Sequence, residues 1–380
     1  MKSTKYSAMD FGLVVFGFVI IGVLEGITAP AARALDPSVY LPIILKQELP
    51  TSTPTPTQTP TPTPTPTQYG GDIQSLAFSP AYLSDMNLFV GSSEGLFMTT
   101  DGGGTWNQID DVSSTDLAVS PGYSSDHTLF QAAGIFVYKT TDWVSWYGTT
   151  PWSPYYVKAL AISPQFVTDQ TILAGTWAGV ARSTDQGASW EKLTNSPTKV
   201  KFLALTTNYP SDLTLFAGTD TQGVYKSTDG GTTWGAVNDG LTSLSIRDLV
   251  ISPNYTSDLT VFVATFSEGV FKSTDGGDSW SSVNSGLSSL VMGALAISPN
   301  YTNDHTIFAG TIYNGVFIST DSGGSWTESN SGLGNLEVNE LAISPSYAND
   351  QTVLAGTADG VFKSTDAGAN WVIIGVPIAK

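Results

Sequence analysis

The stretch GVFKSTDGGDSW, residues 269–280, recurs down the chain in near-copies. Aligned on their last residue, the copies give seven tryptophans spaced 40 to 46 residues apart: Trp106, Trp146, Trp190, Trp234, Trp280, Trp326 and Trp371. A repeat period of about 40 to 50 residues indicates an array of similar units rather than two or three independent domains. The spacing therefore predicts architecture, but by itself it names neither a ligand nor a reaction.

Each repeat has the pattern of four short strands. In the fifth repeat, apolar, β-branched or hydroxyl-rich runs separated by turn residues predict strands at residues 249–252, 260–265, 270–273 and 281–284. Four strands per unit at this period predict an all-β, seven-bladed β-propeller. We expect the ring to close where the last strand, residues 372–378, meets residues 70–76.

The repeated motif reads S-x-D-x-G-x-S/T-W. An Asp in a tight turn can accept backbone hydrogen bonds, Gly permits positive φ, and the Trp fills the space beside the hairpin. Because a catalytic group is not needed seven times around a ring, we interpret the motif aspartates as structural: Asp101, Asp142, Asp185, Asp229, Asp275, Asp321 and Asp366. In blade 2 the motif, residues 140–146, is one residue short and degenerate.

A second Asp recurs in the loop after each first strand, and we assign it a structural role in that turn: Asp85, Asp126, Asp169, Asp212, Asp258, Asp304 and Asp350. The two histidines, His127 and His305, directly follow two of these aspartates. We therefore predict that both are solvent-side loop residues rather than catalytic groups or metal ligands.

With these motifs, residues 70–376 or so resemble the Asp-box, or BNR-repeat, propellers. That superfamily includes sialidases, sortilin-type receptors, xyloglucan-cleaving glycoside hydrolases and photosystem II assembly factors. The resemblance implies that the Asp box is a fold element on the face away from the ligand. Sialidases of this superfamily hold the substrate carboxylate with three arginines, and the predicted propeller has only Arg182 and Arg247, so we exclude sialidase activity. The xyloglucan-cleaving enzymes usually have two propellers flanking a cleft, with a pair of Asp residues as acid and base.

The amino-acid composition argues against some classes of partner and metal site. The 380-residue chain has a formal charge of −18, which argues against nucleic-acid binding. It has no cysteine, so disulfides and thiolate metal sites are excluded. The sequence indicates no cofactor and no metal site, and we expect a monomer.

The N-terminal part divides into three segments. Residues 1–34 have the pattern of a signal peptide cleaved near Ala34, although Asp10 beside the apolar run leaves an uncleaved membrane anchor as the alternative. Residues 35–49 contain a short apolar segment of unknown role, and residues 50–68 form a Thr/Pro-rich linker or stalk. The propeller is predicted over residues 69–380, in a protein that is secreted or displayed at the cell surface.

Departures from the repeat are where a ligand site is expected. The connection after the degenerate motif, residues 147–157, is rich in aromatic residues and lies on the same face as the turn that carries Trp177. Trp152, Tyr155, Tyr156 and Trp177 are therefore candidates for a stacking surface. The alternative is that these rings replace packing lost with the short motif.

Charged residues recur where the innermost strand begins. Lys158, Lys201 and Arg247 share one repeat position, and Asp116, Asp248 and Glu340 share the next. A basic arc facing acids at the channel mouth would orient a charged or polyhydroxylated ligand, whereas the alternative is a solvated rim. If the protein is an enzyme, the candidate carboxylates on this face are Glu94, Asp220, Glu268, Glu340 and Asp359.

These features favour a non-catalytic propeller that binds a glycan or a protein partner through one face. The alternative is a polysaccharide-active glycoside hydrolase or lyase that uses a carboxylate pair. A further alternative, by resemblance alone, is an assembly-factor-like scaffold for a membrane protein complex.

Overall fold

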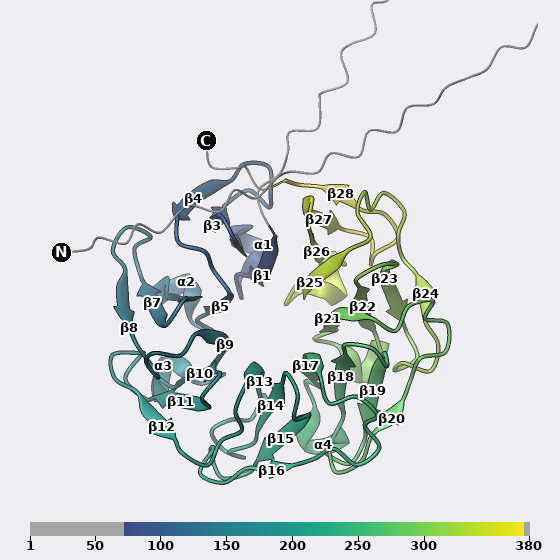
Figure 1. The fold of residues 1–380 in the computed structure, drawn as a ribbon. Helices are drawn as coiled ribbons and strands as arrows, with labels where there is room; N and C mark the ends of the chain where they lie inside the picture. The colour runs from purple at the N-terminus through teal and green to yellow at the C-terminus, as the bar shows by residue number, and fades with distance from the viewer. Residues whose placement is uncertain (1–71, 376–380) are drawn as a thin grey trace, which may run out of the picture. The chain divides into compact units, whose positions relative to one another are not determined.

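The computed structural model describes residues 72–375. The segments predicted at residues 1–34, 35–49 and 50–68 lie outside the described residues. Within the described part, seven antiparallel four-stranded sheets are arranged as blades of a ring, with the first strand of each nearest the centre (Figure 1). The predicted seven-bladed all-β propeller is confirmed.

The strands of each blade pair in chain order, so every blade is a simple meander. The innermost strands are β1 (Ile73–Phe78), β5 (Asp116–Val119), β9 (Val157–Ile162), β13 (Val200–Leu205), β17 (Ile246–Ile251), β21 (Met292–Ile297) and β25 (Val338–Ile343). The second strands are β2 (Leu88–Ser92), β6 (Leu129–Ala133), β10 (Ile172–Thr176), β14 (Leu215–Thr219), β18 (Val261–Thr265), β22 (Ile307–Thr311) and β26 (Val353–Thr357).

The third strands are β3 (Gly95–Thr99), β7 (Phe136–Thr140), β11 (Val180–Ser183), β15 (Val224–Ser227), β19 (Val270–Ser273), β23 (Gly315–Ser319) and β27 (Gly360–Ser364). The outermost strands are β4 (Asn107–Asp110), β8 (Tyr147–Thr149), β12 (Glu191–Leu193), β16 (Gly235–Ala236), β20 (Ser281–Ser282), β24 (Thr327–Glu328) and β28 (Val372–Ile373). In blade 5 the third strand matches its prediction, whereas the first begins three residues earlier than predicted, at Ile246.

The hydrophobic core lies between blades. Every residue of the second strands is buried, because each such strand has neighbours on both sides in its sheet and a blade against each face. One cluster shows the arrangement, with Phe216 of blade 4 packed among Leu249, Phe271 and Trp280 of blade 5. Each blade is therefore stabilised mainly by contact with its neighbours.

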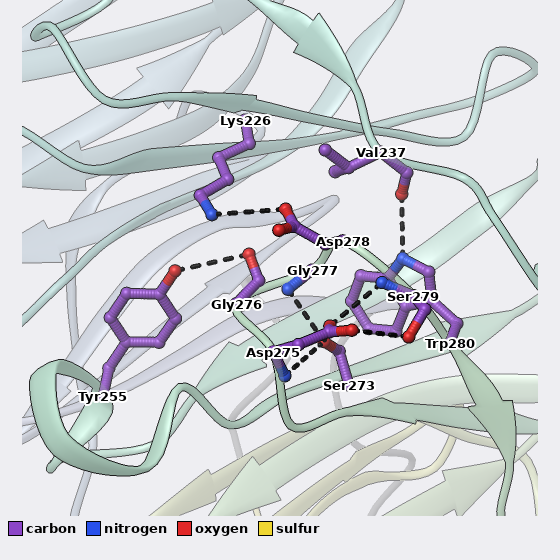
Figure 2. A network of polar contacts seen from close by, with 10 residues as sticks. All are labelled: Lys226, Val237, Tyr255, Ser273, Asp275, Gly276, Gly277, Asp278, Ser279 and Trp280. Carbon is purple, nitrogen blue, oxygen red and sulfur yellow. Dashed lines mark hydrogen bonds and ion pairs between the residues drawn. The ribbon is translucent and has the colours of Figure 1, made fainter.

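The Asp box is a closed hydrogen-bond network (Figure 2). In blade 5, Asp275 Oδ1 accepts from Ser273 Oγ at 2.7 Å and from the Ser279 N–H at 2.9 Å. Asp275 Oδ2 accepts from Ser279 Oγ at 2.5 Å, and the Trp280 indole N–H donates to Val237 O of blade 4 at 2.8 Å. Hydrogen bonds from Ser279 and Ser273 lower the pKa of Asp275 to about 2. All donors to this carboxylate lie within its own turn, which supports the structural interpretation of the motif.

The loop aspartates fix a second turn. Asp258 accepts from Ser252 Oγ at 2.5 Å and from the Thr260 N–H at 2.9 Å, and the same arrangement occurs in all seven blades. In six blades this loop contains a helical turn that the sequence analysis did not predict: α1 (Tyr82–Asp85), α2 (Tyr123–Asp126), α3 (Phe166–Asp169), α4 (Tyr255–Asp258), α5 (Tyr301–Asp304) and α6 (Tyr347–Asp350). His127 and His305 are exposed residues with positive φ that end two of these turns.

In several blades a basic side chain on the third strand forms a hydrogen bond to the Asp box of the next blade. Lys272 donates to Ser322 O at 3.2 Å, Lys363 to Gly102 O at 2.9 Å and Arg182 to Gly230 O at 2.8 Å. In each case the acceptor lies in the Asp box of the following blade. Much of the small complement of Lys and Arg therefore serves the blade interfaces.

Ring closure uses the same contacts as the other blade interfaces. The Trp106 indole N–H of blade 1 donates to Ile374 O, just after β28, at 3.1 Å. The innermost strand β1 packs beside β25 and β26, where the Ile73 side chain lies against Gly356. Ile374, just after β28, packs against the cluster that contains Ile73 and Leu76, as predicted for the closing contact. The strands β28 and β1 do not pair, because β28 is an outermost strand and β1 an innermost one. Residues 70–71 and 376–378 of the predicted contact lie outside the described residues.

The degenerate box of blade 2 is repacked by Trp143. Its N–H donates to Thr140 Oγ1 at 2.9 Å, the bond that Gly277 makes to Ser273 in blade 5. The Trp143 ring stacks on Phe89 of blade 1, with 5.7 Å between ring centroids. In blade 5, Gly277 contacts the corresponding ring, Phe216. The large ring of Trp143 itself thus fills the space left by the shortened turn.

Candidate functional site

The innermost strands surround the centre of the ring (Figure 1). Residues at the starts of these strands line two hollows that share part of their lining. The wider one, at the channel mouth, has a volume of about 730 Å³, and the deeper one a volume of about 180 Å³. Both are lined by Lys158, Lys201, Phe202 and Glu340. We call the wider hollow the mouth cavity and the narrower one the inner cavity.

The basic arc predicted from the sequence lines the mouth cavity. Lys158, Lys201 and Arg247 lie near the starts of β9, β13 and β17, which are consecutive around the ring. Burial, followed by the positive charge of Lys201, lowers the pKa of Lys158. Lys201 forms an ion pair with Asp220, whose pKa is lowered chiefly by its hydrogen bond from that lysine.

The three acids at the next repeat position line the inner cavity. Asp116, Asp248 and Glu340 are half-buried in the wall of the inner cavity, where the surrounding strands reduce the hydration of their carboxylates. This desolvation raises the pKa of Asp116 and that of Asp248 to about 6. Burial, and then repulsion from both aspartates, raises the pKa of Glu340 well above its usual value.

The two aspartates also bridge neighbouring blades. Asp116 of blade 2 accepts from the Leu117 N–H and from the Leu160 N–H of blade 3, both at 2.7 Å. Its Oδ1 also accepts from Ser75 Oγ of blade 1 at 3.2 Å. The sequence analysis placed Asp116 and Asp248 at the channel but missed this role, because it depends on which backbone N–H groups of the next blade face the channel.

Flat apolar side chains flank the mouth cavity. Trp177, in the β10–β11 turn, is 49% exposed, and Phe266, in the β18–β19 turn, is 46% exposed. The Arg247 guanidinium stacks on the Phe266 ring, 4.4 Å from its centroid. The sequence analysis did not select Phe266, although it occupies the repeat position of Trp177 two blades further on, and aligning the repeats at this turn identifies it.

The remaining aromatic candidates lie beside this cavity rather than in its lining. Trp152 packs against Gly179, with the Lys192 ammonium over its ring at 5.4 Å. Tyr155 and Tyr156 are exposed, and the Lys158 ammonium lies 5.8 Å from the centroid of the Tyr156 ring. The structure therefore brings Trp177 together with the basic arc and leaves Trp152 inside the blade 3 packing.

Of the five candidate carboxylates, Glu340 alone lines these two cavities. Glu94, Glu268 and Asp359 are exposed in the turns between second and third strands, in blades 1, 5 and 7. Asp220, in the same turn of blade 4, is held by Lys201. The predicted set therefore does not converge as a group, and Glu340 is accompanied instead by Asp116 and Asp248.

A third hollow of about 590 Å³ lies between blades 2 and 3. It is lined by the degenerate box and β8, including Trp146 and Tyr147, and by the Asp box of blade 3. In blade 4 the connection after the outermost strand covers the next box, with the Trp280 N–H donating to Asp239 O at 2.8 Å. The connection after β8 makes no such bond among the described residues, which leaves this groove open.

Across residues 72–375, no group of three or more His, Cys, Asp or Glu side chains is arranged to hold a metal ion. No helix in that range is both long and apolar enough to span a membrane.

Comparison with known proteins identifies the architecture. The Sortilin-Vps10 family model, described as sortilin, neurotensin receptor 3, matches residues 178–311. No curated protein matches the chain.

Three GH74 enzymes are among the solved structures that share the fold. The GH74 enzyme of Niastella koreensis superimposes with a TM-score of 0.67 at 19% identity, covering 82% of this chain and 55% of its own. The GH74 xyloglucanase of Xanthomonas campestris gives 0.65 at 17% identity, with coverages of 82% and 55%. An ancestral GH74 enzyme gives 0.65 at 17% identity, with coverages of 81% and 46%.

This chain thus spans about half the length of those enzymes, and at these identities the likeness shows the fold alone. The family-model match adds sequence-based support for the resemblance to Asp-box propellers, because the matched residues contain three of the Asp boxes. Together, the sortilin match and the seven-bladed ring with its Asp boxes confirm the resemblance of this chain to the Asp-box propeller superfamily.

Proposed function

We propose that this protein is a non-catalytic, glycan-binding propeller whose ligand occupies the mouth cavity. The observation that carries the proposal is the lining of that cavity, where the half-exposed rings of Trp177 and Phe266 flank a hollow of about 730 Å³. Ligand sites are typically concave, with apolar walls and a few polar groups that fix orientation. Gln74, Asn339 and the basic arc supply those polar groups.

A sugar suits this lining better than a wholly apolar ligand. The C–H face of a pyranose ring packs against an aromatic ring, while its hydroxyls need donors and acceptors at the edges. Trp177 offers such a face, and charged and amide side chains surround it. The acids of the inner cavity add acceptors for hydroxyl groups.

A glycan array probed with the full chain tests the proposal. We expect binding to a defined set of glycans and a loss of roughly five- to thirtyfold in affinity for Trp177→Ala, since removing one stacking ring costs on the order of 1 to 2 kcal/mol. Tyr313→Ala is the matched control, because Tyr313 lies in the equivalent turn of blade 6 and is 67% exposed but does not line the cavity. An array without binding, together with capture of a protein partner lost in Trp177→Ala, would favour a protein ligand instead.

The second candidate function is cleavage of a polysaccharide. It is favoured by three carboxyl groups with raised pKa values that face one cavity, a property common in catalytic sites. Against it, Asp116 and Asp248 already accept backbone hydrogen bonds, and glycoside hydrolysis needs two carboxyl groups free to act. One of the structural neighbours is described as a xyloglucanase. New reducing ends released from xyloglucan by the full chain, and abolished in Glu340→Gln, would support this function over simple binding.

The proposal includes presentation outside the cytoplasm, either secreted or at the cell surface. Its support is the signal-like pattern of residues 1–34 and the Thr/Pro-rich residues 50–68. Fractionation of expressing cells, followed by N-terminal sequencing of the mature chain, tests this part. A start near residue 35 in the extracellular fraction is expected, whereas an intact N-terminus in the membrane fraction would indicate an anchor.

A further inference from the structure

We propose that the mouth cavity binds a carboxylate-bearing polysaccharide, a polyuronate, with the sugar carboxylate at Lys158 and a ring face against Trp177. This inference rests on the proposed function and names the class of glycan for that same site.

The basic arc is not required by the fold. At the repeat position of Lys158, Lys201 and Arg247, the other four blades carry the uncharged residues Gln74, Thr115, Gly293 and Asn339. All seven innermost strands nevertheless form and pair with their neighbours. Three adjacent cations in a chain of formal charge −18 therefore point to an anionic ligand rather than to a structural need.

Two of the three cations are available to a ligand. Across residues 72–375, the ion pairs are Arg182–Glu191, Lys201–Asp220 and Lys226–Asp278, so neither Lys158 nor Arg247 has a carboxylate partner there. Lys158 is half-buried at the cavity and repelled by Lys201. A bound carboxylate would compensate the charge of Lys158, which has no carboxylate partner among the described residues, so the site is electrostatically suited to an anion.

The acids at the next repeat position, which line the inner cavity, limit the kind of anion that the mouth cavity can bind. Asp116, Asp248 and Glu340 lie below the basic arc and would repel a phosphate or a densely sulfated chain that reached into the inner cavity. A polyuronate carries a single negative charge per sugar ring. Its carboxylate can remain at the mouth, while its hydroxyls approach Glu340 and Asn339 as hydrogen-bond donors.

Isothermal titration of the full chain with oligogalacturonate and with its fully methyl-esterified form tests the inference, because the two ligands share a backbone and differ in charge. We expect the acid form to bind about tenfold or more tightly than the ester at low salt, with the difference shrinking as salt rises. Lys158→Met should lower the affinity for the acid form about tenfold and leave the ester unchanged. Lys192→Met, on the outermost strand β12 and away from the cavity lining, removes the same charge and should change neither.

The outcomes separate this inference from the function on which it rests. Equal affinities for acid and ester, unaltered in Lys158→Met, would overturn the polyuronate assignment while leaving a glycan-binding propeller. Dextran sulfate that binds as tightly as oligogalacturonate, and with the same dependence on Lys158, would overturn the assignment to a carboxylate sugar. Failure of acid, ester and every neutral glycan to bind would contradict both proposals.

Discussion

The carboxylate of Asp248 in blade 5 accepts a hydrogen bond from the backbone N–H of Leu295 in blade 6, with 2.7 Å between Oδ2 and N. Its other oxygen accepts from the Leu249 N–H, also at 2.7 Å. Glu340 occupies the same repeat position in blade 7, and its side chain makes no hydrogen bond among the described residues. The same repeat position therefore has different roles in two blades. In blade 5 Asp248 links neighbouring blades, whereas in blade 7 Glu340 presents a carboxylate to the channel.

Replacing these two acids should lower the free energy of unfolding by different amounts. Asp248→Ala leaves two backbone N–H groups without their acceptor, so we expect the free energy of unfolding to fall by about 2 kcal/mol. Glu340→Ala removes a repelled, desolvated charge without orphaning a donor, so the fall should be smaller or absent at pH 7.5. Urea denaturation of both variants measures the difference. Equal destabilisation would show that the bond to Leu295 does not tie the blades.

The channel acids also predict how stability changes with pH. Their pKa values are higher in the folded than in the unfolded protein, so the folded state binds more protons and is favoured at low pH. This contribution is complete below the unfolded pKa of about 4. It is lost as pH rises through the folded value of about 6 for Asp116 and Asp248. The free energy of unfolding should therefore decrease between pH 4 and pH 7.

The Asp-box aspartates change the free energy of unfolding in the opposite direction to the channel acids, and they do so at lower pH. The pKa of Asp185, Asp229, Asp275 and Asp321 is lowered to about 2 in the folded protein, so their contribution is complete above pH 4 or so and is lost as pH falls toward 2. Above pH 4, these aspartates therefore do not mask the channel acids. Denaturation of Glu340→Gln across the same range should show a shallower decrease than the unsubstituted chain, and superimposable profiles would contradict this assignment.

We expect replacement of Trp143 to lower the stability of the protein without changing its affinity for a glycan. Trp143→Gly removes the ring stacked on Phe89, so we expect a loss of about 3 kcal/mol in the free energy of unfolding, partly offset because Gly tolerates the φ of 62° at this position. Val144→Gly is the control, since Val144 is 83% exposed and should cost less than about 0.5 kcal/mol. Loss of glycan binding in a folded Trp143→Gly protein would instead give this residue a functional role.

Closure of the ring predicts cooperative loss of stability on truncation. Deleting residues 372–380 removes β28 and the Ile374 carbonyl that accepts from Trp106. Because each blade depends on its neighbours, we expect one unfolding transition at a markedly lower Tm rather than loss of blade 7 alone. Deleting only residues 376–380 keeps these contacts and should change Tm little. An unchanged Tm in the longer deletion would contradict closure through this interface.

The periodic features were predictable from the sequence. Seven tryptophans at a regular spacing, and an Asp box with the same side-chain types in nearly every copy, identify blades because each copy must satisfy the same local geometry. The shared position of Lys158, Lys201 and Arg247 likewise predicted residues that line one cavity, since equivalent positions in a ring face its centre.

The irregular features were not predictable in the same way. Trp152 belongs to a connection whose sequence differs from the equivalent connections of the other blades, so its place against Gly179 follows from packing that the repeat does not specify. The bond from Leu295 to Asp248 joins residues 47 positions apart in adjacent blades, and side-chain type alone does not reveal it. Glu94, Glu268 and Asp359 were predicted as candidates because they share one face of the ring. That face extends beyond the mouth cavity, and these three residues do not line it.

A crystal structure of the full chain bound to its tightest array glycan tests the central claim most directly. We predict sugar density in the mouth cavity, with one sugar ring stacked on Trp177 and the rest of the glycan crossing the starts of β9, β13 and β17. Sugar bound instead in the groove between blades 2 and 3, against Trp146 and Tyr147, with the mouth cavity free of ligand, would contradict it.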